Sequence, residues 1–249
     1  MRTDFARATT LMTNADYRLF NDYRVYNRYL SAGEVREIAR GLVRHYTFND
    51  ACSGVFNSDS SVTNTATTAY DASGFSKDGI VTGTVQLAYD TIRYNSCINL
   101  SGGGYITADS LPTQVKTISF WVKGGETTTT VMFADYNTKI GFGFSSAGYP
   151  IVASSLQQTP SNTVFTKDGY DSSKWNHIVI TKNDSNVYGL YINGQAMTPN
   201  GNSYWIHNTT NLCIGCRNNG SYQTNFNGKI SDFRAYVKLF TQDDVTDLY

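Results

Sequence analysis

Long apolar runs and net charge are both missing from this 249-residue sequence, and each absence excludes a class of function. A membrane-spanning helix needs about 20 mostly apolar residues, so we expect no membrane insertion. The opening MRTDFARATTLMTNADY has scattered charges and no apolar core, so it is not a secretory signal peptide. Because 20 Lys and Arg balance 20 Asp and Glu, no net field favours nucleic acid, and a neutral partner such as a glycan fits at least as well.

The largest local charge imbalance lies between residues 24 and 44. The arginines outnumber Glu34 and Glu37 there, and they are Arg24, Arg28, Arg36, Arg40 and Arg44. Aromatic stacking partners and a wider basic surface are missing around them. The segment therefore predicts a solvated helix face rather than a binding site for a polyanion.

Cysteine is scarce, with four in the chain. Cys213 and Cys216 have the CxxC spacing of zinc and redox sites. Their segment NLCIGCRN has the pattern of a strand, however, and residues three apart on a strand point to opposite faces. Cys52 and Cys97 form no second pair of this spacing. We therefore expect small apolar side chains here, rather than a metal site or a disulfide.

Catalytic motifs are also missing. None of the three histidines, His45, His177 and His207, has a neighbouring nucleophile motif, and no G-x-S-x-G sequence occurs. The glycines of SGGGY, residues 101–105, are followed by no helix with a lysine. They predict a tight turn into a strand rather than a phosphate cradle.

Threonine, serine, asparagine, glycine and aromatic residues are abundant, which is typical of strands and polar turns. Short strand patterns such as KTISFWVKG and WNHIVITKN follow one another through the chain, with turns such as Asn193-Gly194 between them. A first strand begins at about Leu42, and residues 51–69 read as a loop. These patterns predict an all-β fold, a two-sheet antiparallel jelly-roll sandwich with a short C-terminal helix.

One segment of the sequence is repeated. The last stretch, GKISDFRAYVKLFTQDDVTDLY, aligns with residues near the start at a constant offset of 210. The matched pairs include Asp22 with Asp232, Arg24 with Arg234, Tyr26 with Tyr236, Ser31 with Thr241, Glu34 with Asp244 and Val35 with Val245. In both copies a strand pattern ends, and a Ser or Thr followed three residues later by an acid opens a short helix.

The repeat predicts how the chain is organised. Residues 41–249 form one jelly-roll domain, and residues 1–40 form an N-terminal arm that matches only the terminal strand and helix of such a unit. A lone strand rarely stays unpaired, so we expect Leu19 to Tyr29 to join a sheet of its own sandwich or of a neighbouring subunit. The helix with Val35 and Ile38 on one stripe would be the hinge, and the chain would form a homo-oligomer through this arm.

The order of the segments resembles that of a known family. The match runs through GLVRHYTFND, AYDASGFSKDGIVTG, SCINLSGGGYITA, KTISFWVKG, WNHIVITKNDSNVYGLYINGQ and FNGKISDFRAYVKLFTQDDVTDLY. In this order the segments look like a laminin G-like domain of the concanavalin A-like lectin/glucanase jelly-roll superfamily, over almost all of residues 41–249. The resemblance implies one convex and one concave sheet of about six or seven strands each.

The same superfamily includes laminarinase-type glucanases, whose motif resembles E-x-D-x-x-E on one strand. The glutamates of this chain are Glu34, Glu37 and Glu126, and Glu126 has no acidic residue two or five positions later. The pair of carboxylates that a retaining glycosidase needs is therefore missing. We expect a protein that is not an enzyme.

Glycan binding is the positive alternative, because aromatic faces pack on sugar rings while amide and carboxylate groups match hydroxyls. Residues of these types in predicted loops are the candidates, namely Tyr136, Tyr149, Tyr204, Trp205, His207, Asn218 and Tyr222. Edge packing or a protein interface would explain the same residues, and both interpretations stay open.

Calcium is the one cofactor that the resemblance implies, held by acidic side chains and carbonyl oxygens at a rim of the sandwich. Candidate ligands are Asp50, Asp71 and Asp232, of which Asp50 and Asp232 are expected near the same rim. The alternative for Asp232 is a pair with Arg234 or the cap of a turn.

These features favour a non-catalytic recognition module of a larger assembly, on a virion or an extracellular surface, that binds a glycan or a glycoprotein. The Thr/Asn/Gly-rich strands and the lack of a signal peptide resemble modules of bacteriophage virion proteins, such as tail fibres and capsid decorations, which would make other virion subunits its partners. The alternative is a structural or assembly protein whose sandwich packs only against other protein surfaces, including copies of itself.

Overall fold

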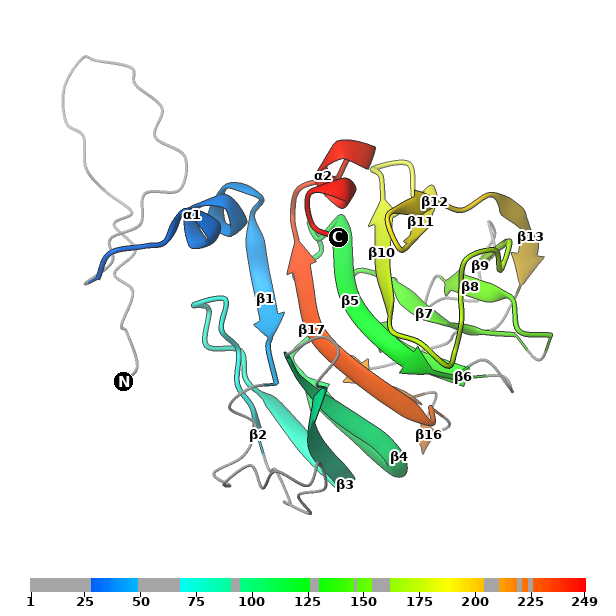
Figure 1. The fold of residues 1–249 in the computed structure, drawn as a ribbon, viewed down its shortest axis with the longest axis horizontal. Helices are drawn as coiled ribbons and strands as arrows, with labels where there is room; N and C mark the ends of the chain where they lie inside the picture. Colours follow the sequence, from blue (N-terminus) through cyan, green and yellow to red (C-terminus); the bar gives the residue numbers. More distant parts are fainter. Residues whose placement is uncertain are drawn as a thin grey trace.

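The computed structural model describes residues 28–48, 68–90, 95–125, 130–145, 147–153, 162–203, 211–218, 221–223 and 226–249. In these ranges the chain is an antiparallel β-sandwich with two short helices, α1 (Ala32–Ala39) and α2 (Gln242–Thr246) (Figure 1). None of the helices described has the length and apolar character needed to cross a membrane. The predicted fold class is confirmed, whereas the expected strand from Leu19 to Tyr29 lies almost wholly outside the described residues. The division of the chain at residue 41 stays a prediction.

The first of the two sheets contains the strands with the clearest alternating patterns. In spatial order they are β12 (Gln195–Ala196), β11 (Tyr188–Ile192), β10 (Asn176–Lys182), β5 (Thr117–Gly124), β17 (Gly228–Tyr236) and the first half of β4 (Asn95–Ala108), with β1 (Leu42–Tyr46) beside the end of β17. The predicted Asn193-Gly194 turn connects β11 to β12, and both residues have the positive φ that this hairpin requires, 51° and 78°.

The second sheet begins with β2 (Thr68–Ala69), the first half of β3 (Gly79–Asp90) and the second half of β4. It continues through β14 (Leu212–Ile214), β6 (Thr130–Asp135), β7 (Gly141–Phe144), β8 (Pro150–Ala153), β9 (Asn162–Phe165) and β13 (Pro199–Ser203). A separate two-stranded hairpin follows β14 and consists of β15 (Arg217–Asn218) and β16 (Tyr222–Gln223).

The β3–β4 hairpin belongs to both sheets because it is bent. Ile98 of β4 pairs with β17, whereas Ile106 pairs with β14. The register shifts at Thr84, where Gly83 and Gly103 have φ values of 75° and 78°. The prediction of a tight turn at residues 101–105 was therefore wrong, because these glycines bend one continuous strand.

The core lies between the two sheets. Phe120 of β5 meets Phe133 of β6 and Phe142 of β7 edge to face, with ring centroids 5.4 and 5.7 Å apart. Ile118 and Val122 share the buried face of β5 with Phe120, as the alternation in KTISFWVK predicts. This packing of one sheet on the other fixes which side chains of each strand point outward.

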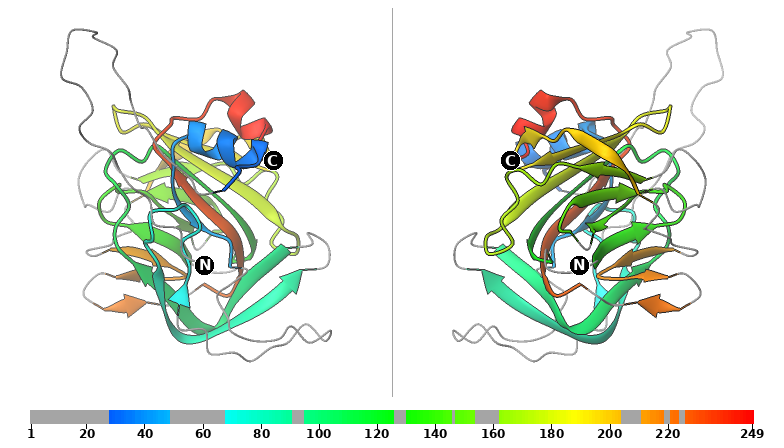
Figure 2. Two further views of the ribbon diagram at one scale, coloured as in Figure 1. Left: turned by 90° about the vertical axis from the view of Figure 1, so that its left-hand side faces the viewer. Right: turned by 90° about the vertical axis from the view of Figure 1, so that its right-hand side faces the viewer.

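Both predicted capping boxes are present, with Ser31 and Thr241 as the N-caps of α1 and α2. The two helices differ in what they bury. Val245 of α2 is fully buried on the outer face of the first sheet, whereas Val35, its repeat partner in α1, is 52% exposed. The helices lie near each other (Figure 2), and Arg40 at the end of α1 forms an ion pair with Asp247.

Candidate functional site

Two tyrosine rings stack on the outer face of the second sheet. Tyr105 projects from β4 and Tyr222 from β16, with ring centroids 4.8 Å apart and planes 23° apart. Tyr222 is 44% exposed, and Tyr105 is half-buried. We call Tyr105, Tyr222 and the paired hairpin residues Arg217 and Asn218 the tyrosine-pair surface.

The position of the β15–β16 hairpin is fixed at the end of β14. Cys213 of β14 forms a disulfide with Cys216, and Gly215 between them has a φ of 80°. The Gly215 amide donates to the carbonyl of Met132 on β6. A side chain at position 215 would collide with Leu100, so glycine is required.

The expectation that Cys213 and Cys216 are only apolar core residues was wrong. A continuous strand would place their side chains on opposite faces, but the positive φ of Gly215 interrupts the strand and returns Cys216 to the face of Cys213. Cys97 is buried, and Cys52 lies outside the described residues.

The surroundings of the tyrosine pair supply hydroxyl and amide groups. Thr82 pairs with Tyr105 across the β3–β4 ladder and is exposed, while Asn218 pairs with Tyr222 and is almost buried. Tyr105 and Thr107 alternate with core residues, so both lie on the outer face. The surface thus combines aromatic rings with the exposed hydroxyl of Thr82, which can exchange hydrogen bonds with a hydroxyl-rich ligand.

Only part of the predicted glycan site comes together. Because β14, β6 and β7 are antiparallel, Asn218, Tyr222 and the β7–β8 turn with Tyr149 lie at one end of the sheet. Tyr149 is half-buried beneath Lys167, whose Nζ is 5.9 Å from the ring centroid. Tyr136 follows β6 at the opposite end. The candidates Tyr204, Trp205 and His207 lie outside the described residues.

Tyr105 was missed by the sequence reasoning, which considered only loops. Its position in the strand pattern GYITA was the available signal, because the alternation with Ile106 places Tyr105 on the outer face. A tyrosine on the solvent side of a strand can face a ligand just as a loop tyrosine can.

Asp232 belongs to a charged group with His45 and Arg234. Its Oδ1 lies 2.8 Å from His45 Nε2 and 2.9 Å from Arg234 Nε. Burial opposes ionisation of this carboxyl, but the hydrogen bond from His45 and the positive charges of Arg234 and His45 outweigh it and hold the pKa of Asp232 well below its usual range. The pair with Arg234 that was weighed as the alternative to calcium is present.

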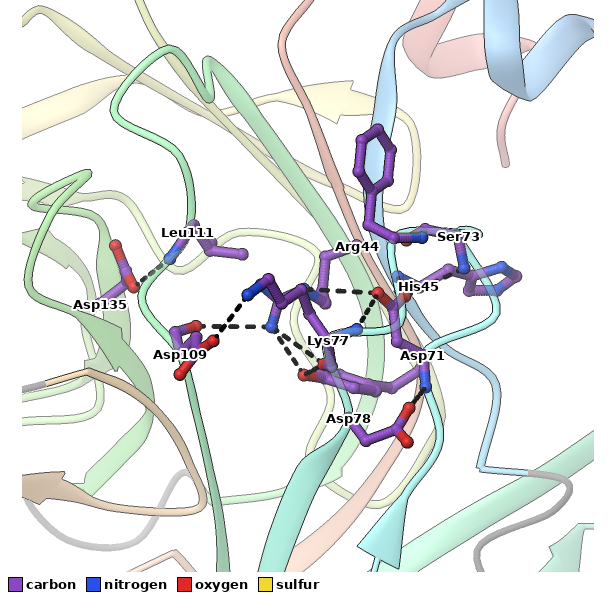
Figure 3. Close-up of polar contacts among 11 residues, drawn as sticks. Arg44, His45, Asp71, Ser73, Lys77, Asp78, Asp109, Leu111 and Asp135 are labelled. Carbon is purple, nitrogen blue, oxygen red and sulfur yellow. Dashed lines mark hydrogen bonds and ion pairs between the residues drawn. The ribbon is translucent and has the colours of Figure 1, made fainter. Parts of the chain in front are cut away.

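Asp71 contacts the backbone of His45, whereas Asp232 contacts its imidazole ring. Figure 3 shows Asp71 at this rim of the sandwich. Its Oδ1 accepts hydrogen bonds from the amides of His45 and Ser73, both at 2.9 Å, and its Oδ2 accepts one from the Lys77 amide at 3.1 Å. Arg44 Nε is 3.8 Å from the same Oδ2. The carboxylate is thus surrounded by N–H groups and an arginine.

The two described calcium candidates do not converge. Asp71 faces Arg44 and Asp232 faces Arg234, and each carboxylate is paired with its own cation. Across the described ranges, no three His, Cys, Asp or Glu side chains gather as a metal site would require. Asp50 lies outside these ranges, so its convergence with Asp232 stays a prediction.

The interpretation of residues 24–44 as a solvated basic face was wrong for two arginines. Arg40 is 6% exposed and lies between Glu37, Asp247 and the ring of Phe240. Arg44 is 2% exposed. Their acidic partners include residues distant in the chain, which a local count of charges does not find.

A serine and a histidine also meet, which the sequence reasoning did not foresee. Ser119 Oγ lies 2.8 Å from His177 Nε2, on neighbouring strands β5 and β10. Both residues are almost fully buried, at 2% and 1% exposed, and Trp121 stacks on the imidazole at 4.8 Å. Their burial beneath an aromatic ring is that of a polar pair in the packing rather than that of a site open to substrate.

Comparison with known proteins places the chain in a family. A family model described as the concanavalin A-like lectin/glucanases superfamily matches residues 100–246, which is more than half of the chain. A search of curated protein sequences finds no significant match.

Solved structures show the same fold. Domain 4 of AbnA, an extracellular arabinanase from Geobacillus stearothermophilus in complex with arabinotriose, is 19% identical with a TM-score of 0.53, over 84% of this chain and 98% of that one. The binding domain of Paraclostridial Mosquitocidal Protein 1 is 18% identical with a TM-score of 0.56, over 76% and 51%. The binding domain of botulinum neurotoxin DC, in complex with rat synaptotagmin II, is 20% identical with a TM-score of 0.52, over 76% and 50%. The chain spans about half the length of these toxin domains.

Proposed function

The chain belongs to the concanavalin A-like lectin/glucanase superfamily, and we propose that it is a non-catalytic recognition module that binds a glycan through the tyrosine-pair surface. The glycan would be free or part of a glycoprotein at a cell surface. The observation that carries this proposal is the stacked, solvent-facing pair Tyr105 and Tyr222.

The chemistry of the surface supports a neutral, hydroxyl-rich ligand. A stacked tyrosine pair presents apolar ring surface with a phenol hydroxyl at its edge. Asn218 and Thr82 lie opposite the two tyrosines on the neighbouring strands β15 and β3. The balanced charge of the chain favours no charged partner. One of the similar structures, the arabinanase domain, was determined with arabinotriose, which makes short arabino-oligosaccharides reasonable first probes.

A hydrolytic function has less support, although the superfamily includes glucanases. Ser119 and His177 are buried, and substrate would have to displace Trp121 to reach them. Glu126, the one glutamate outside α1, lies outside the described residues. Turnover of a polysaccharide that is abolished by Glu126→Gln would revive the enzyme interpretation.

A structural role in an assembly is the second candidate, favoured by exposed apolar residues. Ile80, on the same outer face as Tyr105, is 65% exposed, and Val35 of α1 is 52% exposed. Both would suit contacts with other protein subunits. A place on a virion and a homo-oligomer formed through the N-terminal arm remain predictions from the sequence, and both are compatible with either candidate. The similar structures described above come from an arabinanase and from toxins.

A glycan array that includes arabino-oligosaccharides tests the proposal on the full chain. We expect Tyr222→Ala to weaken binding at least about tenfold, which corresponds to about 1.4 kcal/mol. Tyr29→Ala is the matched control, because Tyr29 is fully exposed and precedes α1, which lies well away from β16 (Figure 1). A wild-type chain that binds no glycan and forms a stable oligomer would favour the assembly role instead. Binding that survives Tyr222→Ala would move the site elsewhere.

A further inference from the structure

Arg44 is a buried positive charge at the rim of the sandwich. Strand β1 buries it on the same side as Tyr46, and only 2% of its surface is exposed. Figure 3 shows Arg44 between Asp71 and Asp109. Removing a guanidinium from water costs several kcal/mol unless oxygen atoms replace its hydration. The rim must therefore be built to hold a cation.

Oxygen atoms of different chemical types converge on the guanidinium. Its Nη1 lies 2.8 Å from Tyr46 Oη, 3.2 Å from the Lys77 carbonyl and 3.4 Å from the Asp109 carbonyl. These are three acceptors around a nitrogen that carries two hydrogens. Carbonyl and carboxylate oxygens around one positive centre are also the ligands that calcium prefers.

The fourth oxygen comes from the Asp71 carboxylate, at 3.8 Å from Arg44 Nε. Within the part of the chain that the structure describes, Nε is buried without a hydrogen-bond partner. Asp71 thus contributes to the site as the negative partner in an ion pair with Arg44 and not as a hydrogen-bond acceptor for Nε.

The loop before β3 shapes this rim around the carboxylate. Asp71 is held by backbone amides on both oxygens, and its own amide donates to Asp78 Oδ1 at 2.9 Å. At the surface, Lys77 Nζ lies 3.0 Å from Asp109 Oδ2. Two positive charges, the buried one of Arg44 and the exposed one of Lys77, therefore already face the acidic groups, and they would repel a divalent ion.

We propose that the guanidinium of Arg44 is the resident cation of this rim. The guanidinium lies among the oxygen atoms that would otherwise ligate a calcium ion. The domain is therefore stable without calcium. Arginine keeps its charge at every accessible pH, so the substitute is permanent. The proposal stands apart from glycan binding and predicts only that any such binding needs no calcium.

Thermal unfolding of the full chain in EDTA and in millimolar calcium chloride tests this role. The wild-type Tm should differ by less than about 1 °C between the two buffers. Arg44→Met removes the charge at similar volume and should lower Tm by about 10 °C, because the rim oxygens lose their cation. Calcium should then raise the Tm of Arg44→Met by at least about 2 °C.

Arg28→Met is the matched control, because Arg28 forms an exposed ion pair with Glu34. It should change neither the Tm nor its response to calcium. A wild-type Tm that falls in EDTA would overturn the proposal, and so would an Arg44→Met chain that calcium does not stabilise. If Arg44→Met does not fold, Arg44→Lys keeps one charge in the rim and should fold and ignore calcium, whereas a calcium-dependent Tm of Arg44→Lys would overturn the proposal.

Discussion

His45 Nε2 and Asp232 Oδ1 lie 2.8 Å apart across strands β1 and β17, where β17 departs from regular pairing. Asp232 has a φ of 54°, and the register of β17 against β5 shifts between Ser231 and Arg234. The bulge turns the Asp232 carboxylate toward His45 and Arg234, so a local irregularity of the backbone creates the charged group.

Asp232→Asn should destabilise the fold by about 3 kcal/mol at pH 7, because it leaves the guanidinium of Arg234 without its carboxylate. Asparagine tolerates the positive φ, so the backbone is not the cause. The folded-state pKa of Asp232 is lowered below its ordinary value of 3.8, so its contribution is present above about pH 4 and is lost as the pH falls further. Urea unfolding from pH 7 to pH 2.5 should show the two chains approaching each other below pH 4. A constant difference across this range would contradict the assignment.

Val245 and Val35 offer a matched pair of substitutions within the repeat. Val245→Ala should cost about 2 kcal/mol, because it opens a cavity beneath α2 next to Val179 and Tyr236. Val35→Ala should stay within about 0.5 kcal/mol, because Val35 is 52% exposed. Urea unfolding of both variants measures the difference. Equal losses would mean that α1 buries its valine in solution, as an arm docked on another subunit would.

Much of the fold could be predicted from the sequence because alternation along one strand is a local signal. The residues Ile118, Phe120 and Val122 are spaced to share a face, and they do. Both capping boxes are equally local, since each joins residues three apart. Long-range partners left no such signal. Arg44 bonds to carbonyls 33 and 65 residues away, so its burial could not be foreseen from its neighbours.

The candidate site was predicted only in part, for a related reason. Asn218 and Tyr222 were chosen by residue type, but Tyr105 meets Tyr222 only because β4 bends and β14 ends in a turn. A single residue, Gly215, changes the direction of the chain. This change brings Cys216 to Cys213 for the disulfide and sets the position of the β15–β16 hairpin. Rules that assume a continuous strand fail at such a residue.

Gly104→Ala should destabilise the domain by about 2 kcal/mol or more, because a Cβ there would collide with the Thr84 carbonyl and Val85 at the bend of the β3–β4 hairpin. Gly33→Ala in α1 is the matched control, since its Cβ would meet only Ser31 Oγ at 3.8 Å. That change should stabilise α1 slightly, because alanine favours helix more than glycine does. Thermal unfolding separates the two variants. Tolerance of Gly104→Ala would mean that the hairpin can bend elsewhere.

Reduction of the Cys213–Cys216 disulfide should loosen the β15–β16 hairpin while the sandwich stays folded. The bond closes a very short loop, so its loss should cost about 2 kcal/mol and lower Tm by about 6 °C. Amide hydrogen exchange should rise at Arg217 and Asn218 but not in β5 or β10, which lie in the other sheet. The double variant Cys213→Ser/Cys216→Ser is the control, because a reductant should no longer change its Tm or its exchange. If reductant lowered the Tm of that variant as well, the effect would come from another cysteine, and the hairpin would not depend on this bond.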